Sequence, residues 1–151
     1  MNVLRAKPTD AETLSRIARS AKAHWGYPES WLQQWQVELT ITPEAIKAHP
    51  TFIATDAGRI IGVCMLKLAE STASIEHMWV LPDAMGRGVG RALFVQAEIE
   101  ARSSGAVNLC IISDPHAEEF YIRMGAKIVG HLPARMDQTE RFLTLLEKPL
   151  V

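Results

Sequence analysis

Residues 78–94 read Met-Trp-Val-Leu-Pro-Asp-Ala-Met-Gly-Arg-Gly-Val-Gly-Arg-Ala-Leu-Phe. A strand-like run comes first, a glycine-rich loop over residues 85–90 follows, and a helical pattern begins directly behind it. Alternate glycines keep side chains off the loop, so several backbone N–H groups can converge on an anion. The helix start adds unpaired N–H groups and a positive dipole end, and Arg87 and Arg91 add full charge. The stretch therefore predicts a phosphate-binding cradle between a strand and a helix.

Two common phosphate-binding loops do not match this one. No Gly-Lys-Ser or Gly-Lys-Thr follows the glycines, which excludes the P-loop of nucleotide-binding proteins. The dinucleotide-binding fingerprint needs Gly-x-Gly-x-x-Gly at a first βαβ turn, whereas residues 86–90 give Gly-x-Gly-x-Gly in the middle of the chain. The phosphate is therefore expected to belong to another class of ligand.

The pattern on either side of the loop predicts a mixed α/β protein. Strands are expected at residues 2–6, 51–55, 59–68, 74–81, 106–113, 127–130 and 142–147. Helices are expected at residues 10–25, 28–39, 88–104 and 115–124, with a short one from residue 43. Hairpins feed a βαβ unit, which brings two strands together in parallel. The sheet should therefore contain both parallel and antiparallel neighbours.

The bulk properties are those of a folded protein of one domain. The chain has 151 residues, enough for a substantial core, and no linker divides it, so residues 1–151 are predicted to form a single domain. The net charge of -1 gives no basic excess for nucleic acid, and no apolar run approaches the roughly 20 residues of a membrane span. Cys64 and Cys110 lie in apolar runs and are expected to be buried thiols rather than a disulfide or metal ligands. The N-terminus has no signal-peptide pattern, so the expected location is the cytoplasm.

Three blocks of the sequence resemble the GCN5-related N-acetyltransferase (GNAT) family. Residues 85–90, Met-Gly-Arg-Gly-Val-Gly, resemble its coenzyme A pyrophosphate loop, Gln/Arg-x-x-Gly-x-Gly/Ala. Residues 75–82, Ile-Glu-His-Met-Trp-Val-Leu-Pro, are similar to its fourth strand. Residues 114–125, Asp-Pro-His-Ala-Glu-Glu-Phe-Tyr-Ile-Arg-Met-Gly, resemble its Asn-x-x-Ala-x-x-x-Tyr-x-x-x-Gly block. The likeness covers residues 51–130, and the order of elements over residues 2–150 fits the family's α/β fold of about seven strands with flanking helices.

The resemblance implies an enzyme that uses acetyl-CoA as its cosubstrate. It would move the acetyl group directly from the thioester to a primary amine, expected to be that of a small molecule. The family's usual Gln or Arg is Met85 here, which predicts a weaker hold on the cofactor. This departure keeps a second interpretation open, a non-catalytic acyl-CoA-binding sensor of the same fold. Transfer to oxygen and transfer of a longer acyl chain also stay open, because a fold does not define its chemistry.

The resemblance also implies the cofactor site. In the family the thioester and the pantetheine arm pair with the backbone of the fourth strand, which corresponds here to Met78, Trp79 and Val80. The predicted cofactor-binding residues are Met78, Trp79, Val80, Met85, Gly86, Arg87, Gly88, Val89, Gly90, Arg91, Asp114, Ala117 and Tyr121. No metal ligand is predicted.

Two residues are predicted to carry the chemistry. Tyr121 is the expected general acid, because a phenol with an ordinary pKa near about 10 is protonated at neutral pH and can donate to a leaving thiolate. Glu76 is the expected base or amine anchor. If strand alternation holds, its side chain shares a face with Met78 and Val80.

The acceptor side is predicted from an aromatic break between the first two helices. Trp25 and Tyr27 flank a glycine there, and in the resembled fold these helices overhang the acceptor site. An aromatic wall suits an apolar or cationic amine, so Trp25, Tyr27 and Glu76 are the predicted substrate-binding residues. The acceptor stays open among small amines, amino acids, aminoglycosides, peptide N-termini and lysine side chains. The final strand, over residues 142–146, is expected to be an exposed edge that could pair in a homodimer.

Overall fold

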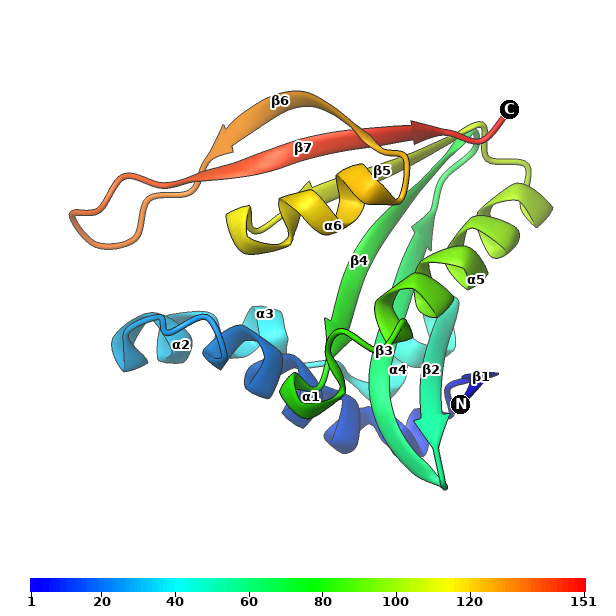
Figure 1. The fold of residues 1–151 in the computed structure, drawn as a ribbon, viewed down its shortest axis with the longest axis horizontal. Coiled ribbons are helices and arrows are strands. Elements are labelled where there is room, and N and C mark those ends of the chain that lie inside the picture. Colours follow the sequence, from blue (N-terminus) through cyan, green and yellow to red (C-terminus); the bar gives the residue numbers. More distant parts are fainter.

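The computed structural model describes residues 1–151 and contains one seven-stranded sheet in the order β1-β2-β3-β4-β5-β7-β6 (Figure 1). The strands are β1 (Asn2–Arg5), β2 (Thr51–Asp56), β3 (Arg59–Leu68), β4 (Thr72–Val80), β5 (Asn108–Ser113), β6 (Lys127–Pro133) and β7 (Phe142–Pro149). All neighbours are antiparallel except β4 and β5, which are parallel. The predicted mixed sheet is therefore confirmed.

Helices cover both faces of the sheet (Figure 1). They are α1 (Ala11–Ala23), α2 (Glu29–Gln34), α3 (Gln36–Leu39), α4 (Pro43–Ala48), α5 (Val89–Ser103) and α6 (Glu118–Arg123), with the 3-10 turns η1 (Pro8–Asp10), η2 (Pro82–Ala84) and η3 (Pro115–Ala117). None of the helices combines the length and the apolar character that crossing a membrane requires.

Each face of the sheet has its own core. The apolar face of α5 is buried against the strands, through Val89, Leu93, Phe94, Ala97 and Ala101. On the opposite face, side chains of α1 and α4 pack against β2 and β3, through Leu14, Ile17, Ile46, Ile53, Val63 and Met65. The sheet is thus held between two helical layers, which fixes the position of the loop that precedes α5.

Two predicted helices are not continuous α-helices in the structure. The helix expected at residues 28–39 breaks at Trp35, which ends α2 and precedes α3. Trp35 is buried together with Ala18 and Leu39, so packing against α1 overrides the continuous helical pattern. The helix expected at residues 115–124 begins with the 3-10 turn η3.

The parallel pairing of β4 with β5 stops halfway along β4. The last paired residues are Ile75 and Ile111. Beyond them β4 stays paired with β3 up to Val80, while β5 continues beside β7, and the two strands diverge (Figure 1). One edge of β4 is therefore unpaired over its last residues.

A β-bulge in β4 lies at the point of divergence. Met65 of β3 pairs with His77, and the next residue of β3, Leu66, pairs with Ile75, so Glu76 is the extra residue. An extra residue bends its strand and resets the alternation of side chains beyond it. The bulge therefore accounts for the bend of β4 away from β5.

The expected exposed edge at residues 142–146 is wrong for most of that strand. β7 lies between two neighbours, paired with β5 from Thr144 to Pro149 and with β6 from Phe142 to Glu147. The edge strand on this side is β6. Local patterns indicate strands but not their lateral order, and here the last strand inserts beside β5. The predicted homodimer loses this support.

Candidate functional site

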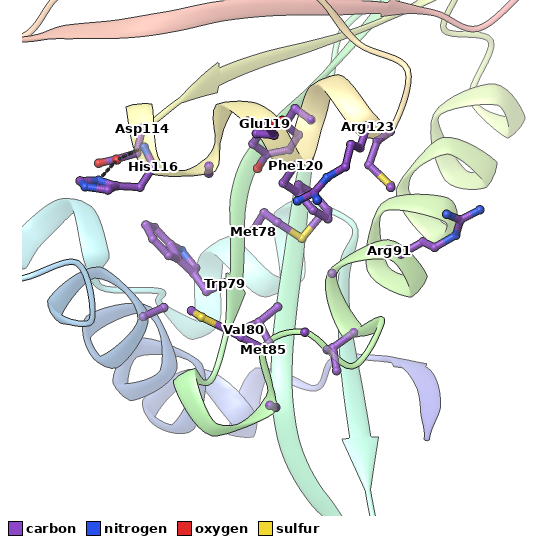
Figure 2. Close-up of a pocket in the computed structure, with 18 of the residues that line it drawn as sticks. Met78, Trp79, Val80, Met85, Arg91, Asp114, His116, Glu119, Phe120 and Arg123 are labelled. Carbon is purple, nitrogen blue, oxygen red and sulfur yellow. Dashed lines mark hydrogen bonds and ion pairs between the residues drawn. The ribbon is translucent and has the colours of Figure 1, made fainter.

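A cavity of about 570 Å³ opens where β4 leaves β5. Its walls come from the end of β4, the glycine loop and the start of α5, η3 with α6, and the end of α1 (Figure 2). The predicted site residues that line it are Trp25, Met78, Trp79, Val80, Met85, Gly86, Gly88, Val89, Gly90, Arg91, Asp114, Ala117 and Tyr121. Tyr27, Glu76 and Arg87 are not among the lining residues.

The backbone of β4 faces the cavity at Met78 and Val80. In an antiparallel pair, alternate residues direct their N–H and C=O groups toward the partner strand, and the residues between them direct theirs away. The N–H of Leu81 donates to the carbonyl of Ile61 at 2.9 Å. The backbone N–H and C=O groups of Trp79, two residues earlier, therefore also point toward β3. The groups of Met78 and Val80 therefore point to the side that β5 has left, where a ligand could pair with them.

Each glycine of the loop has its own structural reason. Gly86 and Gly88 have φ angles of 77° and 79°, in the left-handed region that favours glycine. A Cβ at either position would meet nothing within 4 Å, so the space beside them is open. At Gly90 a Cβ would lie 3.0 Å from Cε1 of Phe120, so this glycine lets α5 pack closely against α6.

The N-terminus of α5 is open as well. Gly88 is its N-cap residue and offers no side-chain acceptor, and the first turn has no acidic residue. The N–H of Ala92 donates to the carbonyl of Gly88 at 3.1 Å. The N–H groups that precede it, those of Val89, Gly90 and Arg91, have no partner within the helix. An anion here would meet these donors and the positive end of the helix dipole, so the site fits the predicted phosphate cradle.

The side chains around the loop differ in their access to the cavity. Arg91 lines it, whereas Arg87 is exposed outside it. Met85, which stands where the family usually has Gln or Arg, also lines it, and its thioether offers no hydrogen-bond donor. The fixed donors of this part of the cavity are therefore mainly backbone N–H groups.

Tyr121 places a free hydroxyl at the cavity. Its ring is 6% exposed and packs against Phe94 and Phe120 at centroid distances of 6.2 and 5.1 Å. No group of the protein hydrogen-bonds the hydroxyl, and no fully buried polar side-chain atom of the chain is unpaired, so this hydroxyl is reached from the cavity. Burial raises the pKa of Tyr121, and the neighbouring Cys64 adds to the effect. The phenol is therefore a protonated donor at neutral pH.

Neither cysteine is placed as a nucleophile. Burial raises the pKa of the Cys64 thiol to about 12, so almost no thiolate exists at neutral pH. Cys110 was expected to be buried but is partly exposed, because it alternates with the buried Leu109 and Ile111 and points to the other face of β5. Burial, with the charge of Glu147, raises the pKa of Cys110 too.

The prediction that Glu76 shares a face with Met78 and Val80 is wrong. Its carboxylate pairs with Lys67 of β3 at 3.4 Å, and 40% of its side chain is exposed. Met65, two residues before Lys67, packs toward α1, whereas Met78 and Val80 pack on the α5 side. The bulge has reversed the expected alternation at this residue. A catalytic role of Glu76 stays a prediction, with the carboxylate outside the cavity lining.

Asp114 is the centre of a polar network at the α1 end of the cavity. Its Oδ2 accepts hydrogen bonds from Nζ of Lys22 at 2.8 Å and from the hydroxyl of Tyr27 at 2.7 Å. Nη2 of Arg141 lies 3.5 Å from the same oxygen. Oδ1 accepts from the backbone N–H of His116 at 2.9 Å. Burial by itself would raise the pKa of Asp114, but these hydrogen bonds outweigh it and hold that pKa well below its usual range.

Trp25 and Tyr27 occupy different positions. Trp25 lines the cavity, and its ring stacks on His116 at 4.9 Å with an interplanar angle of 8°. Tyr27 lies behind the wall, where its hydroxyl donates to Asp114 and accepts from Nη2 of Arg141 at 3.0 Å. Burial, with the hydrogen bond to Asp114, raises the pKa of Tyr27. Of these two residues, only Trp25 lines the cavity.

Two cations on the cavity wall were not predicted from the sequence. Lys22 lies three residues before Trp25, so helical spacing was a signal that could have found it. Arg123 follows Tyr121 by two residues on α6 and lines the cavity (Figure 2). No local pattern marks Arg123.

A family model described as "Acetyltransferase (GNAT) family" matches residues 14–126, a segment that contains the diverging strand, the glycine loop and Tyr121. The chain therefore belongs to this family. It is an acetyltransferase with acetyl-CoA as its cosubstrate, as the three sequence blocks predicted. No curated protein matches the chain.

Solved structures share the fold over nearly the whole chain. A GCN5-related N-acetyltransferase from Rhodopseudomonas palustris has a TM-score of 0.81 and 22% identity, covering 98% of this chain and 94% of its own. An aminoglycoside 6'-N-acetyltransferase complexed with coenzyme A has a TM-score of 0.75 and 17% identity, covering 100% and 98%. The ribosomal-protein-S18-alanine N-acetyltransferase from Escherichia coli has a TM-score of 0.75 and 17% identity, covering 99% and 93%. At these identities the likeness shows the fold and does not define the acceptor.

Coenzyme A should raise the melting temperature of the protein, and Gly88→Val should abolish that rise, because the new side chain enters the open space beside the loop. The substitution also strains the backbone, so Gly105→Val is the matched control. Gly105 follows the far end of α5, with a φ of 90° and equally open surroundings. The control should keep the shift, measured by thermal denaturation. A folded wild type that shows no shift at millimolar coenzyme A would contradict the prediction.

Met85→Arg should tighten coenzyme A binding, because it adds a charged donor to a cavity wall that has none at this position. One charge-assisted hydrogen bond at a partly exposed site contributes roughly 1 kcal/mol, about a fivefold lower Kd. Isothermal calorimetry measures the change, with Met85→Leu as the control that leaves affinity unaltered. Equal affinity of Met85→Arg and wild type would show that backbone donors already satisfy the ligand.

Proposed function

We propose that this acetyltransferase moves the acetyl group from acetyl-CoA directly to the primary amine of a small molecule. The observation that carries the proposal is the meeting, in one cavity, of an open backbone edge at Met78 and Val80 with the free hydroxyl of Tyr121. Direct transfer is favoured because the thiol of Cys64 is held protonated by burial and Cys110 lies outside the cavity lining.

The proposed cosubstrate site has two parts. The amides of the pantetheine arm would pair with the backbone of Met78 and Val80, while the backbone of Trp79 is directed to β3 and only its side chain serves the cavity wall. The pyrophosphate would take the N–H groups of the loop and of the first turn of α5, with charge from Arg91 and Arg123. Both parts are open in the structure and of complementary chemistry.

Tyr121 supplies the proton that the reaction requires. The thioester offers an acetyl carbon that an amine attacks; as the C–N bond forms and the C–S bond breaks, the sulfur gains negative charge. Tyr121 donates a proton to that sulfur. The raised pKa of the phenol makes it a weaker acid, but the same apolar surroundings disfavour a thiolate, so the transfer stays favourable.

The wall at the α1 end favours a compact acceptor. Lys22, Trp25 and His116 line it. Beside them, Asp114 joins α1, the turn after it, the end of β5 and the segment before β7 through its contacts with Lys22, Tyr27 and Arg141. A wall fastened in this way has little freedom to move aside for an extended peptide, and we take this to favour a small amine. The rings of Trp25 and His116 suit an apolar or cationic body next to that amine.

The alternative of a non-catalytic acyl-CoA sensor fits the loop but gives the hydroxyl of Tyr121 no role.

We also propose that residues 1–151 form one domain, supported by a sheet that joins strands from both ends of the chain. A reducing cytoplasm is the proposed location, supported by two free thiols at Cys64 and Cys110.

Tyr121→Phe keeps the buried ring and removes only the proton donor. It should lower kcat by about 10²–10⁴ with little change in coenzyme A affinity. The readout is thiol release from acetyl-CoA in a screen of amines, alongside calorimetry with coenzyme A. Cys64→Ala is the control and should cost stability rather than turnover, because Cys64 is fully buried. A fully active Tyr121→Phe with an inactive cysteine variant would overturn this mechanism.

A further inference from the structure

The ring of His116 makes three contacts at the cavity wall, two at Nδ1 and one on its face. Its Nδ1 lies 2.9 Å from Oδ1 of Asp114 and 3.0 Å from the hydroxyl of Tyr27, and its face stacks on Trp25. The side chain is still 41% exposed, and it lines the cavity (Figure 2). A ring that is fixed in place and open to the cavity has the arrangement of a positioned base rather than of a solvated surface histidine.

The contacts determine which ring nitrogen is free. The carboxylate of Asp114 is ionised and can only accept, so Nδ1 of His116 must carry the hydrogen in their 2.9 Å contact. The hydroxyl of Tyr27 directs its own hydrogen to Oδ2 of Asp114, at 2.7 Å, and is therefore not the donor to Nδ1. In the neutral ring Nε2 then has a lone pair, and no group of the protein hydrogen-bonds it.

We propose that His116 is the general base that deprotonates the acceptor ammonium through Nε2, and that Asp114 is its positioning residue. The proposal rests on the acetyl transfer proposed above and replaces Glu76 as the base. The ammonium gives one proton to Nε2, and the imidazolium keeps its Nδ1–H bond to Asp114 while its exposed edge returns the proton to water. The neutral amine then forms the C–N bond and loses its second proton to the phenolate that Tyr121 leaves on protonating the sulfur. The net products are the acetylated amine, free coenzyme A and one proton.

Charged groups from several elements surround the ring of His116. The titratable and charged groups that face it are Lys22 on α1, His24 and Tyr27 in the following turn, Asp114 after β5, Glu119 on α6 and Arg141 before β7. Lys22 and Arg141 contact the same carboxylate as His116 and offset part of its charge. Glu119 is the other carboxylate of the cavity lining, and it has no contact that fixes its direction.

Two amines of nearly equal size test the role of the base. Ethylamine is almost wholly protonated at pH 7 and needs a base, whereas 2,2,2-trifluoroethylamine is a much weaker base and is largely neutral. His116→Ala should lower kcat/KM about 10²-fold for ethylamine and less than about tenfold for trifluoroethylamine. Each loss is taken relative to the wild type, so the lower nucleophilicity of the fluorinated amine cancels. Added imidazole should restore ethylamine turnover in His116→Ala, which a merely structural role would not allow.

Three controls separate the possible outcomes. His24→Ala, in the adjacent turn, and Glu119→Gln should keep the wild-type ratio of kcat/KM for ethylamine to kcat/KM for trifluoroethylamine. His116→Ala should still show the rise in melting temperature with coenzyme A. Equal losses for both amines, or a selective loss in Glu119→Gln instead, would overturn His116 as the base while leaving acetyl transfer intact. No thiol release by the wild type with any amine would overturn the transfer and this proposal together.

A measurement without an acceptor checks the geometry directly. Nitrogen-15 NMR of the neutral ring should show the hydrogen of His116 on Nδ1 and a bare Nε2. The amide of Asp114→Asn can no longer hold the ring as a carboxylate does. The substitution should therefore shift the tautomer balance of His116, and for ethylamine it should lower kcat while changing KM much less. A hydrogen on Nε2 in the wild type would contradict the proposal whatever the kinetics show.

Discussion

The structure depends on the point at which β4 stops pairing with β5. An extra residue, Glu76, bends β4 after Ile75, and the backbone of Met78 and Val80 loses its neighbour on that side. Backbone N–H and C=O groups in a folded protein need partners. Leaving two such residues open, beside a cavity, gives a ligand with amides of its own a place to continue the sheet. The bulge therefore opens the backbone edge at which we propose that the cosubstrate binds.

The same divergence places the two halves of the site at the ends of two parallel strands. β4 leads through η2 into the glycine loop and α5, which offer unpaired N–H groups. β5 leads into Asp114, η3 and α6, which bring His116 and Tyr121 to the opposite wall. Because both strands run in the same direction, their carboxyl ends lie on one side of the sheet, and their following segments meet across the cavity.

The carboxylate of Asp114 holds the α1 end of the cavity wall together. It binds groups from four separate segments, and its lowered pKa means that it stabilises the folded state in its ionised form. A lowered pKa gives stability that is present above the pKa of an unfolded Asp, near about 3.9, and is lost as the pH falls below it. At neutral pH the network is therefore intact, and the ring of His116 is held in place.

Sequence patterns predicted those parts of the molecule that local chemistry controls. The seven strands, the glycine loop, the helix behind it and the position of Tyr121 follow from short-range spacing and from three blocks that resemble one family. The predicted face of Glu76 was wrong because of the bulge. A bulge depends on how β4 pairs with β3, and the alternation of residues within β4 gives no information about that pairing. That Asp114 contacts the cofactor stays a prediction. Its hydrogen-bond partners Lys22, Tyr27 and Arg141 lie far from it in the chain, so no local pattern could show them. Trp35 interrupts a helix for the same kind of reason, since its packing partner belongs to α1.

The most direct measurement is a crystal structure of the protein with coenzyme A. The open edge of β4 predicts hydrogen bonds of about 2.7–3.2 Å between the pantetheine amides and the backbone of Met78 and Val80, with the pyrophosphate at the N–H groups of the loop. Coenzyme A bound elsewhere, with water on the backbone of Met78 and Val80, would contradict the account.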